Sequence, residues 1–156
     1  MRKSVNTNYL VNKKIDYIVC IESFGYVFGI PVAYNLGCKI ILARKPGKLP
    51  RDTISSHYEM VYDSDRSIEI HSDVIKTGDN VIVIDDFLAS GGTVCAVMDI
   101  LSNFGAKILE SLFIVELPEL NGRDALHSRC ENIYSLIDME YESNKKYWNV
   151  YGTRII

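Results

Sequence analysis

The sequence lacks the features that mark membrane, secreted and nucleic-acid-binding proteins. No apolar run approaches the length of a membrane span, and residues 1–14 are too polar for a signal peptide. The net charge is only −3, so no basic surface for nucleic acid is expected. The four cysteines stand singly in apolar segments without metal-ligand spacing, which predicts buried, reduced thiols and a cytoplasmic protein.

Two common phosphate-binding signatures are also missing, although a glycine turn is present. The segment around Gly91–Gly92 has neither the Lys of a P-loop nor the G-x-G-x-x-G of a dinucleotide site. It reads instead VIVIDDFLASGGT, from Val81 to Thr93. Four β-branched residues predict a buried strand, two carboxylates follow, and a small-residue turn opens a helix. Backbone N–H groups at such a turn bind a phosphate. The pattern therefore indicates a phosphorylated sugar whose hydroxyls are bound by Asp85 and Asp86.

Strands and helices alternate along the chain, which predicts one α/β domain built on a parallel sheet. We expect strands at 15–21, 39–43, 81–84, 107–115 and 133–137, and helices at about 27–36, 93–104 and 121–126. The polar segment 44–70 is expected to form a flexible hairpin over the active site. Ligands bind at the carboxyl ends of such strands, where VIVIDD ends.

Three further segments accompany this motif. ESFGYVFG, beginning at Glu22, follows the first strand, and RKPGKLP, beginning at Arg44, follows the second. Cations on a loop stiffened by proline suit a pyrophosphate, because ionised N–H donors form the strong hydrogen bonds. Near the end of the chain, VEL is followed by LNGR, which ends at Arg123.

Together these segments resemble the type I phosphoribosyltransferases, and among them the adenine phosphoribosyltransferase family, over roughly residues 15–137. The resemblance implies a Rossmann-like fold with helices flanking a parallel sheet, a homodimer, and a single domain over residues 1–156. It implies that 5-phosphoribosyl 1-pyrophosphate (PRPP) binds with Mg²⁺, held by PRPP oxygens and waters rather than by a protein site. Pyrophosphate is then displaced at C1 of the ribose with inversion.

The same resemblance assigns candidate roles to individual residues. The 5′-phosphate would be bound by Ala89, Ser90, Gly91, Gly92 and Thr93. The pyrophosphate would be bound by Ser23, Phe24, Gly25, Arg44 and Lys48. The catalytic candidates are Asp85, Asp86, Glu22 and Tyr62, the acids being candidate bases.

The acceptor side departs from the family. Phe24 stands where the family has Arg, Val61 where it has Glu, and only 14 residues precede the first strand, where the family has a hood that recognises adenine. We therefore expect an open site and an acceptor other than adenine, namely a sugar hydroxyl on a growing glycan, with a partner phosphatase. The alternatives are adenine salvage, with a hood supplied by a partner or by the tail 138–156, and a non-catalytic PRPP sensor.

Overall fold

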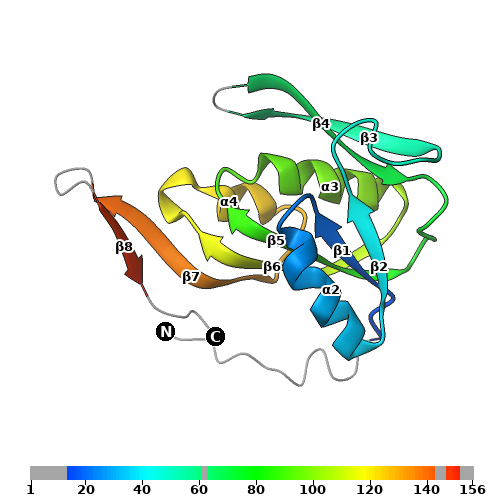
Figure 1. Cartoon of the computed structure of the whole chain (residues 1–156), viewed down its shortest axis with the longest axis horizontal. Coiled ribbons are helices and arrows are strands. Elements are labelled where there is room, and N and C mark those ends of the chain that lie inside the picture. The colour runs from blue at the N-terminus through cyan, green and yellow to red at the C-terminus, as the bar shows by residue number, and fades with distance from the viewer. Residues whose placement is uncertain (1–13, 61–62, 143–146, 152–156) are drawn as a thin grey trace.

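A six-stranded sheet forms the centre of the protein (Figure 1). The computed structural model describes residues 14–60, 63–142 and 147–151. The sheet has the order β2-β1-β5-β6-β7-β8, and its first five strands run parallel while β8 is antiparallel to β7. The strands are β1 (Tyr17–Ile21), β2 (Lys39–Ala43), β5 (Asn80–Leu88), β6 (Lys107–Glu116), β7 (Ile133–Glu142) and β8 (Tyr147–Tyr151).

Helices cover both faces of this sheet, which explains the unbroken apolar run of β5. Helix α2 (Gly25–Leu36) packs on β1 and β5, where Ala33 meets Ile18 and Ile82. Helix α3 (Gly92–Asn103) covers the other face with Val97, Met98 and Leu101. The short elements η1 (Pro118–Leu120) and α4 (Gly122–Leu126) connect β6 to β7.

The hairpin of β3 (Thr53–Met60) and β4 (Asp63–His71) is a separate two-stranded sheet. Ile68 and Ile70 are buried in the cluster that includes α3, and Figure 1 shows the hairpin outside that helix. The backbone of Arg44, just after β2, exchanges two hydrogen bonds with Glu69 of β4, of 2.9 and 2.7 Å. The hairpin is thus joined both to α3 and to the end of β2.

The predicted α/β class and the parallel sheet flanked by helices are confirmed. Several boundaries differ: β5 continues to Leu88, so both carboxylates lie inside the strand, and β7 continues to Glu142. Strand β8 was not predicted, and it lies at the sheet edge with β6 and β7 between it and β5. The described part of the tail therefore extends the sheet. In the part of the chain that the structure describes, no helix is long and apolar enough to cross a membrane.

Candidate active site

Asp85 and Asp86 lie near the carboxyl end of β5 and differ in burial. Asp85 is only 7% exposed, whereas Asp86 is half-buried, and the Asp86 N–H donates to Asp85 Oδ1 over 2.9 Å. Desolvation raises the pKa of Asp85 to about 8, and the neighbouring Asp86 carboxylate contributes in the same direction. In the free protein at neutral pH, Asp85 is therefore mainly protonated.

The turn of residues 89–93 connects β5 to α3. Gly91 occupies the N-cap with φ 83°, a left-handed conformation that favours glycine. A Cβ there would also lie 2.7 Å from Leu126 Cδ1 and 3.1 Å from the carbonyl oxygen of Gly122, so a side chain would displace its neighbours. The first turn, Gly92–Cys95, carries no acidic residue. Its backbone N–H groups and the helix dipole can therefore serve an anion, with the half-buried Ser90 and Thr93 beside them.

The turn that follows β1 lies against the same strand end. A Cβ on Gly25 would lie 2.7 Å from the carbonyl oxygen of Ile84 and 3.3 Å from Asp85 Oδ1. This position therefore needs glycine to let the turn approach β5. Ser23 and Phe24 are exposed in the same turn, and the Phe24 side chain is 61% exposed.

The cationic loop after β2 is held by Glu22. One carboxylate oxygen, Oε2, accepts from Arg44 Nε over 3.3 Å and from the Lys45 N–H over 2.9 Å. Arg44 Nη1 donates to the carbonyl oxygen of Lys48 over 3.0 Å, and the exposed Lys48 carries another cation of the loop. Glu22, predicted as a candidate base, is thus engaged in positioning Arg44.

The structure brings together the ends of three neighbouring strands. Glu22 and Gly25 follow β1, and Arg44 follows β2. Asp85 lies on the neighbouring strand β5, next to Gly25 and a few residues before the turn 89–93. Tyr62, and Val61 beside it, lie outside the described residues. Among the residues that are described, no cluster of three or more His, Cys, Asp or Glu could hold a metal ion.

Sequence reasoning assigned no role to the residues behind the phosphate turn. Gly122, at the start of α4, lies so close to the turn that a Cβ would be 2.1 Å from the carbonyl oxygen of Ala89. Its neighbour Arg123 forms an ion pair with the buried Glu116. The VEL and LNGR segments contain these residues, but their sequence alone does not show which turn they contact.

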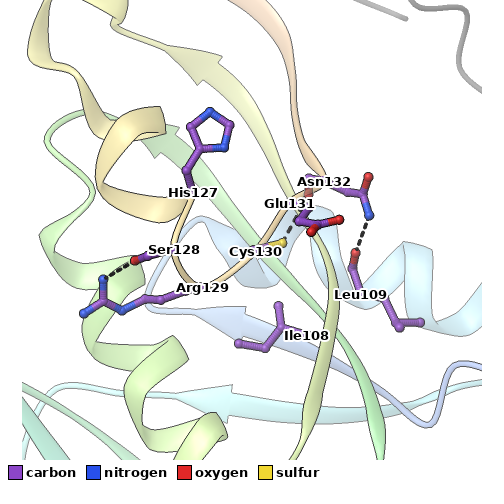
Figure 2. A pocket seen from close by; sticks show the side chains of 8 residues that line it. All are labelled: Ile108, Leu109, His127, Ser128, Arg129, Cys130, Glu131 and Asn132. Carbon is purple, nitrogen blue, oxygen red and sulfur yellow. Dashed lines mark hydrogen bonds between the residues drawn. The ribbon is translucent and has the colours of Figure 1, made fainter.

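A separate hollow of about 340 Å³ lies at the opposite end of the sheet (Figure 2). It is lined by residues 127–132 and by Ile108 and Leu109 near the start of β6. Its polar groups bond to one another: Asn132 Nδ2 donates to the carbonyl oxygen of Leu109 over 3.1 Å, as the dashed line in Figure 2 shows. This hollow is remote from the carboxyl end of β5 and does not belong to the candidate site.

Strand topology, paired carboxylates and a glycine turn at a helix N-terminus are the features expected of a site for a phosphorylated sugar. The family profile of the phosphoribosyl transferase domain matches residues 1–144. The chain therefore belongs to the type I phosphoribosyltransferase family, and it is a phosphoribosyltransferase enzyme.

Within this family the chain is similar to adenine phosphoribosyltransferases. It is 44% identical to that of Geotalea uraniireducens over 127 residues, covering 81% of this chain and 72% of the relative. It is 48% identical to that of Clostridium botulinum over 118 residues, covering 76% and 68%. The crystal structure of the Saccharomyces cerevisiae enzyme, in complex with an imino-altritol bisphosphate and adenine, matches with a TM-score of 0.76 and 36% identity, covering 82% of this chain and 70% of that one.

These relatives overturn the predicted acceptor. The prediction of a sugar hydroxyl on a growing glycan, with its partner phosphatase, is wrong, because identities of 44–48% connect this chain to adenine enzymes. It gave too much weight to local departures such as Phe24. That side chain is mostly exposed, and the close approach of the turn to β5 is made at Gly25 rather than at Phe24.

Proposed function

We propose that this protein is an adenine phosphoribosyltransferase, which converts adenine and PRPP into AMP and pyrophosphate in purine salvage. The observation that carries this proposal is the 48% identity to an adenine phosphoribosyltransferase over 118 residues. The geometry at the end of β5 supports the donor half of the reaction. Its free thiols suit a reducing cytoplasm, where we propose that it acts.

The turn Ala89–Thr93 is proposed to bind the 5′-phosphate of PRPP. Gly91 and Gly92 expose backbone N–H groups at the start of α3, and the hydroxyls of Ser90 and Thr93 add donors. The contact between Gly91 and α4 leaves the turn little freedom to move. Such a preorganised turn loses little entropy when the phosphate binds.

Asp85 and Asp86 are proposed to bind the ribose hydroxyls and to stabilise positive charge at the ribose. Displacement at C1 passes through an oxocarbenium-like state, so nearby carboxylates lower its energy. Because Asp85 is mainly protonated in the free protein, it must lose its proton to take part as an anion. The approach of a cation favours that ionisation.

We propose that the pyrophosphate is bound by the turn Ser23–Gly25 and by the cations Arg44 and Lys48. When the bond between C1 and the pyrophosphate oxygen breaks, the pyrophosphate leaves with its electron pair. Glu22 acts here by fixing the orientation of Arg44 through Oε2. PRPP would bring Mg²⁺ as its counter-ion, which would neutralise charge on the pyrophosphate. The half-exposed Asp86 fits such a hydrated ion, because Mg²⁺ keeps several waters and takes few carboxylates. Tyr62 remains a proposed contact on the acceptor side.

A homodimer is the proposed assembly, with α2 as the interface. The twelve residues of this helix include no charged side chain, yet Val27, Ile30 and Tyr34 are 59%, 44% and 87% exposed. An uncharged, apolar exposed face of this kind is typical of a surface that binds another protein molecule. The adjoining Phe24 is 61% exposed, so the interface would reach the edge of the active site.

The experiment is a product assay on the purified chain. Incubation with adenine, PRPP and Mg²⁺ should yield AMP, identified by mass spectrometry, and equal amounts of pyrophosphate. Hypoxanthine replaces adenine in one control, and Asp86→Asn replaces the wild type in another. The absence of AMP from folded protein that binds ribose 5-phosphate would refute the proposal.

A further inference from the structure

Helix α4 forms the rear wall of the proposed phosphate turn. A Cβ on Gly122 would lie 2.1 Å from the carbonyl oxygen of Ala89, and one on Gly91 would lie 3.1 Å from the carbonyl oxygen of Gly122. The same Cβ on Gly91 would lie 2.7 Å from Cδ1 of Leu126, at the other end of the helix. The turn and the helix are thus in direct contact at two points, so α4 cannot shift without displacing the turn.

A helix of five residues does not hold this position by itself, since isolated short helices are unstable in water. Arg123 anchors it to the sheet. Its guanidinium donates from Nε to Glu116 Oε1 over 2.9 Å and from Nη2 to Glu116 Oε2. Nη1 donates to the carbonyl oxygen of Ile133 over 2.7 Å, and Nη2 also reaches Ser135 Oγ at 3.3 Å.

Glu116, whose carboxylate accepts these hydrogen bonds from Arg123, is itself held in place by its neighbours. The Glu116 side chain is only 5% exposed, and Ser135 Oγ donates to its Oε2 over 2.7 Å. The next residue, Leu117, donates its N–H to the carbonyl oxygen of Leu88 over 2.9 Å, directly before Ala89. The ends of β5 and β6, the first residues of β7 and the start of α4 are therefore linked around one ion pair.

We propose that Arg123 and Glu116 are positioning residues that hold the turn Ala89–Thr93 in the geometry that binds the 5′-phosphate. This inference rests on the proposed function. Bidentate Arg–carboxylate pairs fix orientation as well as distance, which is what a wall behind a phosphate turn requires. Neither side chain touches the substrate. A lysine in place of Arg123 keeps the charge but loses the fork, so α4 gains freedom and the turn becomes less preorganised.

The test compares Arg123→Lys with Arg129→Lys. Arg129 forms an equivalent fork with Asp99, Nε to Oδ1 over 2.7 Å and Nη2 to Oδ2 over 3.1 Å, and it bonds the carbonyl oxygen of Ala125. It therefore offers the same chemistry at the C-terminal end of α4, where it bonds to α3 and not to the strands β6 and β7. Both variants are measured by thermal unfolding, by calorimetric titration with ribose 5-phosphate, and by steady-state kinetics.

Arg123→Lys should weaken ribose 5-phosphate binding and raise KM for PRPP by about tenfold or more, the range seen when supporting residues of a site are changed. Its kcat at saturating PRPP and its KM for adenine should stay within about threefold of wild type. Arg129→Lys should leave ribose 5-phosphate binding and KM for PRPP within about twofold, even if its melting temperature falls equally.

Equal effects of the two variants, or unchanged ribose 5-phosphate binding in Arg123→Lys, would overturn the proposal. If Arg123→Lys does not fold, Glu116→Gln supplies the comparison, because it keeps the side-chain volume and the acceptor oxygen while removing the charge. The binding measurement needs no acceptor. Wild-type protein that binds ribose 5-phosphate but forms no AMP would refute the proposed adenine reaction. The positioning role would still be tested, because it is judged by ribose 5-phosphate binding alone.

Discussion

Replacing the buried Asp85 by asparagine should stabilise the free protein at neutral pH while reducing activity. The folded protein holds the pKa of this carboxyl at about 8, against an ordinary value of 3.8. Between these two values the folded state binds more protons than the unfolded state, so the free energy of unfolding falls as pH rises. At pH 7 this loss amounts to up to ~4 kcal/mol, because each pH unit between the ordinary pKa and pH 7 costs about 1.36 kcal/mol.

Asparagine carries no charge and can still accept the Asp86 N–H through Oδ1. Allowing for the imperfect fit of the amide, we expect a net gain of about 2 kcal/mol at pH 7, or roughly 4–8 °C in melting temperature for a domain of this size. The gain should fall to a small remainder at pH 4, close to the ordinary pKa of the carboxyl, and vanish at lower pH, where the wild type is protonated in both states. The assay is thermal and urea unfolding from pH 4 to 8.

The matched control is Asp52→Asn at an exposed carboxylate, which should change stability little at any pH. A gain in Asp85→Asn that is as large at pH 4 as at pH 7 would show that desolvation of the carboxylate is not its cause. A loss of stability at pH 7 would refute the reasoning altogether.

Two further predictions follow from the same geometry. Binding of PRPP with Mg²⁺ at pH 7 should release up to one proton from Asp85, because a cation beside that carboxyl lowers its pKa. Calorimetry in buffers of different ionisation enthalpy measures the number of protons released. Equal proton release by the Asp85→Asn variant would contradict the prediction. Tyr34→Asp on the exposed face of α2 should convert the dimer to monomers, as measured by sedimentation. Val150→Asp on β8, which is also exposed, should leave the dimer intact. A monomeric wild type at micromolar concentration would contradict the proposed assembly.

Local patterns predicted the strands of the sheet well where each contains a continuous run of apolar residues. The range 39–43 for β2 was correct, and β5 was recognised from four β-branched residues. Its length was underestimated, because Asp85 and Asp86 break the apolar run while their backbone keeps pairing with β6. Strand β8 was missed because an edge strand is defined by its pairing with β7, which local composition does not reveal.

The sequence predicted the arrangement of the candidate site only in part. The order of motifs predicted that Glu22, Arg44 and Asp85 lie at neighbouring strand ends, since parallel strands bring their carboxyl ends to one edge. That Glu22 is engaged by Arg44 depends on a contact across 22 residues. The acceptor was misjudged because single substitutions were read without knowing that Phe24 lies on the surface.

The sequence by itself determined the α/β alternation and the phosphate turn, because both depend on residues close together in the chain. Glycine at Gly91 and small residues around it are required by backbone conformation, a local property. The tertiary structure alone decided the burial that raises the pKa of Asp85 and the placement of α4 behind Ala89. Desolvation and packing depend on which distant segments come together, and the fold brings Arg123, Glu116 and the turn to one place.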